Sequence, residues 1–420
     1  MREILRERSL ARPLHYYLVG TGSWFLAYGI QSVMFAWLVT MVLRESPERV
    51  GFAQMALLLP GTLLILIGGS YADRYGGRKV VILAQSFAVL ASAYLLFIVG
   101  ADRLTYPLII AYALLMGLAQ AFVTPARDGL LNEVAEGRLQ RTVMLTSIIQ
   151  FGLQMVGFLV ASLSDRVGPE LVIGTQMLAL LIGVLGFARI STVARSAPTV
   201  QPRLLRSVVE GAKTVFGSPS MRMVMIQNVA MALFFMGSYI VTMPILVREV
   251  FSGTAQDLAF MNGANSLGLV STILLLLRLG DVQRQGRALL LAESLGARVL
   301  AGAAVAPSSV LWGVASGGWG VCGGAAMTMS RTIMQEQAPE AQRGRVMSFY
   351  SFSFMGAGPV GALICGYLVE LFGPQLALMT AAGCMLAVIL VVWAGSSLWR
   401  LEGHTHQALQ EVQGEAADGV

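Results

Sequence analysis

Two charged residues, Glu293 and Arg298, stand inside an otherwise apolar run of the sequence at about residues 288–306. A carboxyl group in such surroundings is a candidate for carrying a proton, because burial penalises its charged form. The two residues are five positions apart, which on a helix turns them about 140° away from each other, so they are poor mutual partners. Glu293 is therefore a candidate for proton coupling. The alternative is a glutamate near the membrane surface and an arginine that snorkels toward water.

A second group of charged residues follows an apolar run in the segment GGSYADRYGGRKVV, residues 68–81. Gly69 and Gly76 permit close approach of neighbouring helices. Asp73 is placed to pair with Arg74 or Arg78 and to accept hydrogen bonds from the N-terminus of a neighbouring helix. This pattern predicts an ion pair between Asp73 and a neighbouring arginine. The alternative is that the charges only mark a cytoplasmic loop.

Further charges lie where two other apolar runs end. Arg127 and Asp128 stand in PARDGLLNEV, residues 125–134, and Arg331 stands in the similar segment MSRTIMQEQAPEAQRGRVMS. These residues could exchange salt-bridge partners during a conformational change, or they could form static ion pairs. Asp128 is a second candidate for proton coupling.

The elements that must position these residues are membrane helices. Of 420 residues, 56% are hydrophobic and only 12% are charged, which excludes an ordinary soluble protein. Since a membrane-spanning helix needs about 20 apolar residues, the chain has room for twelve spans. The predicted spans are residues 16–43, 50–70, 80–100, 106–126, 143–163, 169–188, 223–247, 257–277, 288–306, 309–329, 346–369 and 374–398.

The distribution of basic residues predicts the orientation of these spans. Of the 29 Lys and Arg residues, 23 fall on the side that carries both termini and Arg298 lies within a span. The other five fall on the opposite side: Arg44, Arg49, Arg103, Arg166 and Arg248. By the positive-inside rule both termini are cytoplasmic. The net charge of +6 is then a topology signal and does not indicate nucleic-acid binding. The N-terminus lacks the pattern of a cleaved signal peptide, so the first span is expected to be retained.

An internal repeat divides the chain into two halves. Arg127 matches Arg331 at an offset of 204 residues, and the RVGPEL around Gly168 matches the LFGPQL around Gly373 at an offset of 205. We therefore expect an N-terminal six-helix half (1–188), a cytoplasmic linker (189–222), a C-terminal six-helix half (223–398) and a cytoplasmic tail (399–420). Within the linker, LLRSVVEGAKTVF has the spacing of an interfacial helix.

The loop motif, the twelve spans and the repeat together resemble the major facilitator superfamily. PARDGLLNEV and the segment 335–373 are similar to one bacterial branch of it, the enterobactin and drug exporters. The resemblance implies an all-α membrane protein with twelve transmembrane helices in two pseudo-symmetric six-helix bundles. It also implies that the Asp73 cluster latches the cytoplasmic side while the outer side is open. Two departures from the family pattern, Tyr71 and Gly77, leave the Asp–Arg pair intact.

The resemblance also implies where a solute cavity and a hinge lie. Gly356, Gly358, Pro359 and Gly361 resemble the glycine–proline motif of proton-driven antiporters, although that motif belongs to the fifth span in those proteins. It is predicted to be a hinge, with tight packing as the alternative. The predicted cavity residues are mostly amides, which suit an uncharged or amphipathic solute, unless they only join helices: Gln31, Gln54, Gln120, Gln154, Asn228, Tyr239, Asn262 and Asn265.

The expected function is secondary active export of a small amphipathic solute, drug-like or siderophore-like, by alternating access and proton antiport. An uptake symporter or a facilitator is the alternative, followed by a non-transporting sensor or assembly factor. No Walker A loop and no Cys or His cluster occurs, so we expect neither an enzyme nor a metal or other cofactor. The expected setting is a monomer in the bacterial inner membrane, in contact with lipid and binding no nucleic acid.

Overall fold

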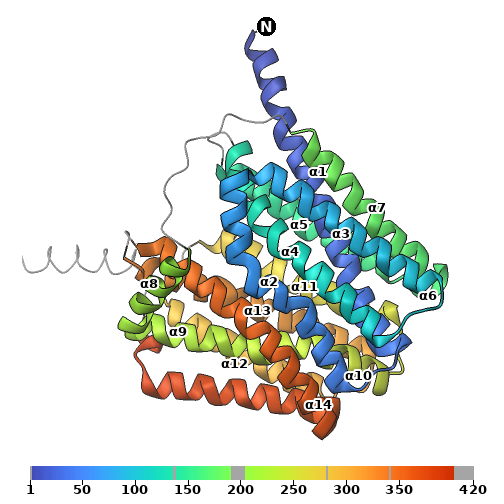
Figure 1. Ribbon diagram of the computed structural model, residues 1–420. Helices are drawn as coiled ribbons and strands as arrows, with labels where there is room; N and C mark the ends of the chain where they lie inside the picture. The colour runs from blue at the N-terminus through green and yellow to red at the C-terminus, as the bar shows by residue number, and fades with distance from the viewer. Residues whose placement is uncertain (1, 136–138, 191–203, 281, 340–341, 402–420) are drawn as a thin grey trace, which may run out of the picture. The chain divides into compact units, whose positions relative to one another are not determined.

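The structure, a computed structural model, describes residues 2–135, 139–190, 204–280, 282–339 and 342–401 (Figure 1). Within these ranges the regular structure is helical and contains no strand. The first part of the chain forms α1 (Arg2–Trp37), the π-helix η1 (Leu38–Val42), α2 (Pro47–Tyr75), α3 (Gly77–Gly100), α4 (Tyr106–Val134), α5 (Leu139–Ala161), α6 (Ser164–Val167) and α7 (Pro169–Ala188).

The second part begins with α8 (Leu204–Gly217), the helix expected in the linker, and α9 (Pro219–Ala230). It continues with the π-helices η2 (Met231–Met236) and η3 (Ser238–Thr242), followed by α10 (Met243–Glu249) and α11 (Ala255–Leu279). The last elements are α12 (Gln285–Ala303), α13 (Ser309–Gln337), α14 (Arg343–Gly395) and the short 3-10 helix η5 (Leu398–Arg400). Linker residues 191–203 and tail residues 402–420 lie outside the described ranges.

The ends of these helices follow from local residue chemistry. Ser308 caps α13, because its hydroxyl accepts a hydrogen bond from the Leu311 N–H at 3.3 Å, and this cap separates α12 from α13. Gly168 has a φ of +88° immediately before α7. Gly373, its counterpart in the repeat, has a φ of +78° and divides α14 into two helical segments. Both positions favour glycine, because a side chain is strained there.

The chain forms two compact units. The first contains Met1–Leu204 together with Pro244–Gly263, and the second contains Leu205–Met243 together with Ala264–Val420. The segment 244–263 therefore belongs to the second half by sequence and to the first unit by its contacts.

Both units contain the same two close helix crossings, each made through a glycine. A β-carbon on Gly157 of α5 would clash with the Leu26 carbonyl of α1, and one on Gly361 of α14 would clash with the Leu233 carbonyl of η2. A β-carbon on Gly117 of α4 would likewise clash with the Leu57 carbonyl of α2. The equivalent pair in the second unit is Gly320 of α13 and the Asn265 carbonyl of α11. The glycines are offset by 204 residues (157 to 361) and 203 residues (117 to 320), close to the offset of the repeat.

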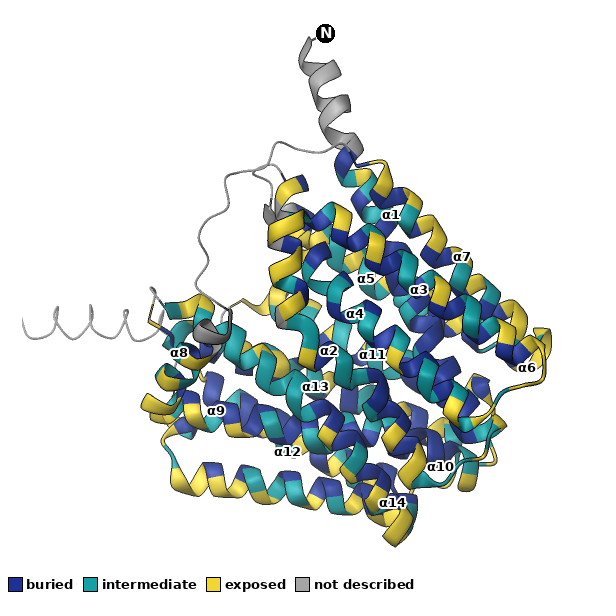
Figure 2. Cartoon of the chain, in the orientation of Figure 1, coloured by how far each residue is buried: buried dark blue, intermediate teal, exposed yellow. Residues whose placement is uncertain are grey.

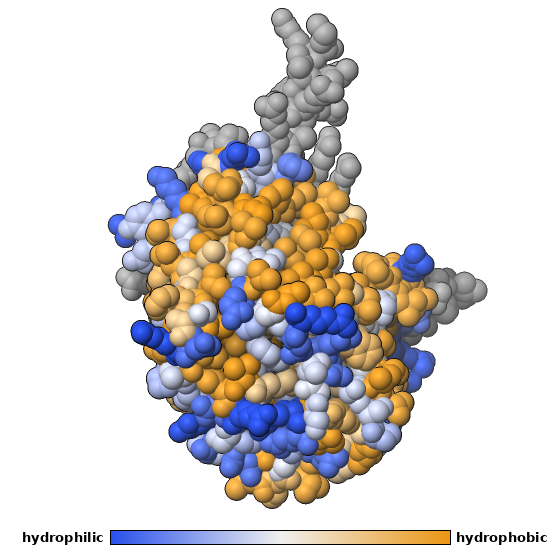
Figure 3. All heavy atoms as spheres, turned by 90° about the vertical axis from the view of Figure 1, so that its right-hand side faces the viewer, coloured by the Kyte–Doolittle hydropathy of each residue, from blue (hydrophilic) through white to orange (hydrophobic). Residues whose placement is uncertain are grey.

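The surface carries many large apolar side chains. Leu83, Leu159, Leu277 and Val391 are each more than 60% exposed. Figure 2 shows exposed and buried residues on opposite sides of several helices, and hydrophobic residues cover much of the face drawn in Figure 3. Among the described residues, eight helical stretches are long and apolar enough to cross a membrane. The predicted number of twelve spans is not confirmed by this count.

Candidate functional site

The loop between α2 and α3 carries the predicted latch. Its backbone turns at Gly76, which has a φ of +91°. Arg78 donates hydrogen bonds from Nε to the Phe187 carbonyl (3.3 Å) and from Nη2 to the Ala188 carbonyl (2.5 Å). It thus adds hydrogen bonds to the last carbonyls of α7, where the helix dipole also favours a cation.

The remaining latch residues are placed as follows. The guanidinium of Arg74 lies 5.4 Å from the centre of the Tyr75 ring. Gly68, the neighbour of the predicted Gly69, makes the close approach to α4, at the Ala121 carbonyl. The side chain of Asp73 lies outside the described part of the structure, so the pairing predicted for it stays a prediction.

Of the two arginines predicted to exchange salt-bridge partners, Arg127 and Arg331, the first is buried, with 8% of its surface exposed. Its guanidinium lies 4.7 Å from the centre of the Phe25 ring, and its Nη2 is 3.2 Å from Oδ1 of Asp128. The Tyr17 hydroxyl donates to the Arg127 carbonyl at 3.3 Å, and Nη1 of Arg127 has no partner in the described structure. Arg331, its counterpart in the repeat, is exposed and forms no ion pair with a described residue. The two positions are therefore similar in sequence and different in environment.

The predicted cavity amides divide into two groups. In the first group, Gln31 (5% exposed) and Gln54 (6% exposed) are buried, and Gln120 and Gln154 are half-buried. No side-chain hydrogen bond joins any of these four amides to a described residue. They come from α1, α2, α4 and α5, the helices that form the two glycine crossings of the first unit. Buried amides without protein partners are able to bind a solute or water.

In the second group the polar side chains already have protein partners. Asn228 donates to the Tyr350 carbonyl (3.2 Å), Asn262 to the Leu258 carbonyl (2.7 Å) and Asn265 to the Ser316 carbonyl (3.1 Å). The ring of Tyr239 packs edge-on against Trp319 with 6.0 Å between ring centres. These contacts join or stabilise helices. They therefore favour the alternative that these side chains hold helices together and do not line a solute cavity.

Sequence reasoning missed Gln227, which precedes Asn228 in α9. Gln227 is 1% exposed, and neither polar atom of its amide has a hydrogen-bond partner in the described structure. The signal was available, because Gln227 is one of two adjacent amides in an apolar run.

The predicted hinge lies inside a continuous helix. Gly358, Pro359 and Gly361 are buried in α14, where the only residue with non-helical backbone angles is Gly373. Gly361 packs against η2, and Gly237, between η2 and η3, packs against the Gly361 carbonyl. The irregular backbone at this contact is therefore in the π-helices of the partner segment, and π-helical turns are common at functional sites. The hinge role of Gly356 and its neighbours stays a prediction.

Glu293 and Arg298 have opposite environments. Glu293 is 2% exposed in α12, and its Oε2 has no hydrogen-bond partner among the described residues, whereas Arg298 is exposed. The expectation that the two do not pair agrees with these positions.

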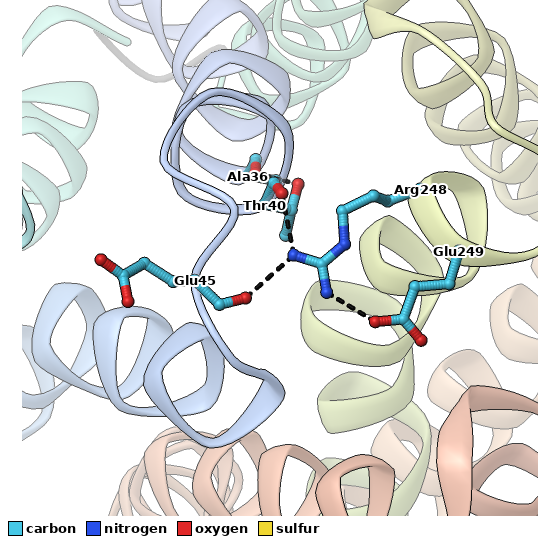
Figure 4. A network of polar contacts seen from close by, with 5 residues as sticks. All are labelled: Ala36, Thr40, Glu45, Arg248 and Glu249. Carbon is cyan, nitrogen blue, oxygen red and sulfur yellow. Dashed lines mark hydrogen bonds and ion pairs between the residues drawn. The ribbon is translucent and has the colours of Figure 1, made fainter.

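A second residue that sequence reasoning missed is Arg248 of α10, within the first unit. It binds the turn between η1 and α2 (Figure 4). Its Nη1 donates to the carbonyls of Thr40 and Glu45, each at 2.9 Å, and its Nη2 is 2.6 Å from Oε1 of Glu249. Thr40 is in the π-helix η1, near a helix end where carbonyls lack a helical partner. A charge-assisted hydrogen bond of this kind is stronger than a neutral one. Seven residues after Arg248, the Ala255 N–H donates to the Asp165 carboxylate at 2.9 Å. Segment 244–263 is thus held to the first unit by polar contacts at both of these points.

A family model described as a transmembrane secretion effector matches residues 18–415. The chain belongs to this family. As a transmembrane secretion effector it is a multi-pass membrane transporter of the major facilitator type and not an enzyme. This confirms the predicted superfamily and the all-α membrane fold, without confirming the number of twelve spans.

Comparison with known proteins agrees with this family. The chain is 25% identical over 372 residues to the multidrug efflux pump Tap of Mycolicibacterium fortuitum, covering 82% of this chain and 86% of the relative. Its fold is similar to those of the nucleoside transporter NupG (TM-score 0.70, 15% identity, 91% and 98% coverage) and the POT family transporter PepTSo (TM-score 0.74, 10% identity, 93% and 98% coverage). At these identities the solved structures support the fold alone.

Proposed function

We propose that this transmembrane secretion effector exports a small amphipathic solute across the bacterial cytoplasmic membrane by alternating access, driven by proton antiport. The observation that carries the export direction is the similarity to an efflux pump over 82% of the chain. The proposed orientation, with both termini in the cytoplasm, rests on the positive-inside distribution of Lys and Arg.

The four unpartnered amides of the first unit support the proposed class of solute. Gln31, Gln54, Gln120 and Gln154 each offer a donor and an acceptor without a net charge. A solute with a few polar groups and a large apolar surface matches such a lining, since most contacts in ligand sites are apolar and a few polar groups orient the ligand. A phosphorylated sugar or a dicarboxylate would instead need a cationic partner.

The two candidates for proton coupling differ in their surroundings. The Asp128 side chain is 63% exposed and is paired with Arg127, so water and a cation already stabilise its charge. Glu293 is almost fully buried, and one carboxyl oxygen has no partner in the described structure. Because an unpaired buried carboxylate is costly, protonation of Glu293 would be strongly coupled to its exposure to water. We therefore assign the coupling proton to Glu293.

Arg248 supports the proposed alternation between two states. In the proposed orientation it lies at the external ends of the spans, and it holds segment 244–263 to the turn after η1. Opening toward the outside would release this contact. The latch at Asp73 and Arg78 would act on the cytoplasmic side.

The test is the accumulation of fluorescent amphipathic dyes in bacterial cells that express the protein, with and without a protonophore. We expect lower accumulation in expressing cells, abolished by the protonophore and by Glu293→Gln. Arg298→Gln, an exposed position in the same helix, is the matched control and should leave export unchanged. Higher accumulation in expressing cells would refute export in favour of uptake, and full activity of Glu293→Gln at normal membrane levels would refute the assignment of the proton.

A further inference from the structure

A cavity of about 680 Å³ lies within the second unit. It is bounded by α12, by the end of α14 and by the segment that continues into η5. None of the predicted cavity, latch, hinge or proton-coupling residues lines it. The transport function proposed above therefore gives it no role.

One end of this cavity is apolar and open to the surroundings of the protein. Leu291 of α12 is 57% exposed, and Leu390 and Trp393 of α14 are 61% and 53% exposed. In a membrane protein such side chains contact lipid chains. Ile389 and Ala394 are five residues apart in α14, so the apolar wall extends about 7.5 Å along this helix, well within one leaflet of a bilayer whose core is about 30 Å thick.

The other end of the cavity is polar and cationic. Arg400 lines it, is exposed, and its guanidinium has no hydrogen bond, ion pair or ring contact with a described residue. Ser397 contributes a hydroxyl, and no Asp or Glu of the described chain lines the cavity. Arg287 places a second positive charge beside this end of the cavity, next to the lining residue Trp399. Its Nε donates to the Trp399 carbonyl (3.2 Å), and its guanidinium lies 5.4 Å from the centre of the Trp399 ring. These contacts hold Trp399 at the edge of the cavity.

We propose that this cavity binds an anionic phospholipid, with the phosphate at Arg400 and Ser397 and an acyl chain along Leu291, Leu390 and Trp393. The order of the groups matches a lipid, since an apolar wall within the membrane leads to a cation and hydroxyls at the membrane surface. Tryptophans favour this boundary because one edge of the ring is polar and the rest is apolar. In the proposed orientation the site is in the cytoplasmic leaflet.

Native mass spectrometry of the purified full-length protein tests the proposal with two lipids, dioleoyl-phosphatidylglycerol and dioleoyl-phosphatidylethanolamine. We expect tighter binding of the anionic lipid, and a loss of about fivefold in its affinity in Arg400→Gln. Arg278→Gln, an exposed arginine at the end of α11, is the matched control and should retain the preference. Equal affinities of both lipids for the wild-type protein, or equal losses in the two variants, would overturn the proposal.

A second measurement does not depend on the behaviour of the Arg400 variant. A photo-crosslinking amino acid at Leu390, in membranes of cells expressing the full chain, should form adducts with phosphatidylglycerol. Adducts with residues 402–420 of the chain itself, or with phosphatidylethanolamine alone, would show a different occupant and refute the proposal. Both readouts are independent of transport, so their failure leaves the proposed export unaffected.

Discussion

Replacing Arg248 with alanine should make the external side of the transporter open more often. The substitution removes two hydrogen bonds from a guanidinium to the carbonyls of Thr40 and Glu45, and it leaves those two carbonyls to water. Hydrogen bonds to a charged group contribute about 1.5–3 kcal/mol each when well protected. The Arg248 side chain is 20% exposed, so solvent screening reduces this, and we take about 1.5 kcal/mol for the pair.

That energy corresponds to an increase of about tenfold in the ratio of outward-open to closed molecules. The assay uses a variant in which Cys322, Cys365 and Cys384 are replaced by alanine and Gln31 is replaced by cysteine. The rate of modification by a membrane-impermeant maleimide added outside the cells should rise about tenfold with Arg248→Ala, since the rate follows the open population.

Two comparisons make this prediction specific. Arg248→Lys keeps the charge but cannot reach both carbonyls with a planar fork, so its rate should lie between those of the wild-type residue and alanine. Arg166→Ala removes another arginine from the same predicted side of the membrane and should leave the rate unchanged. An unchanged rate in Arg248→Ala, at normal membrane levels, would refute the idea that this residue holds the external side closed.

Three further predictions concern single residues of the first unit. Gly157→Ala should lower the thermal melting temperature of the purified protein strongly, because the new methyl group meets backbone, whereas Gly152→Ala in the same helix meets open space and should have little effect. Arg78→Ala should lower the melting temperature by several degrees through the lost carbonyl contacts at the end of α7, and the exposed Lys79→Ala should not; equal melting temperatures would contradict the capping role. Gln54→Ala should reduce dye export several-fold without changing the melting temperature, since its amide has no partner among the described residues, and a large loss of stability would instead indicate a structural role.

The fold could be predicted from the sequence because membrane helices leave a strong compositional signal. Long apolar runs, the polar break at Ser308 and the repeated Gly168 and Gly373 each correspond to an element of the structure. The repeat also predicted that the two halves are built alike, and the glycine crossings at Gly157 and Gly361 occupy equivalent places. These features depend on local chemistry and on spacing along one chain.

The assignment of polar residues could be predicted only as a set. Gln54 and Asn228 are both amides within apolar runs, yet one lacks a partner in the described structure and the other bonds to α14. That difference depends on how neighbouring helices cross, which no spacing within one helix specifies. Arg248 was counted only as an external charge, because its partners are backbone carbonyls, one in the π-helix η1 and one in the turn that follows it. Carbonyl acceptors have no residue identity, so sequence motifs do not reveal them.

The matching glycine crossings have a consequence for the history of the chain. Equivalent backbone contacts at repeat-related glycines are the pattern expected of a duplicated segment, so we infer that the differences between the two units arose after duplication. The four amides of the first unit lack partners among the described residues, while Asn228 and Asn265 in the second bond to neighbouring helices. Both units also contain the opposite kind of amide, since Gln85 and Gln176 of the first unit bond to neighbouring helices and Gln227 of the second has no partner in the described structure. We infer that the shared crossings were kept while the amides around them changed roles position by position, so a chimera carrying two first halves would be expected to assemble the crossings and to lose the hydrogen bonds of Asn228 and Asn265.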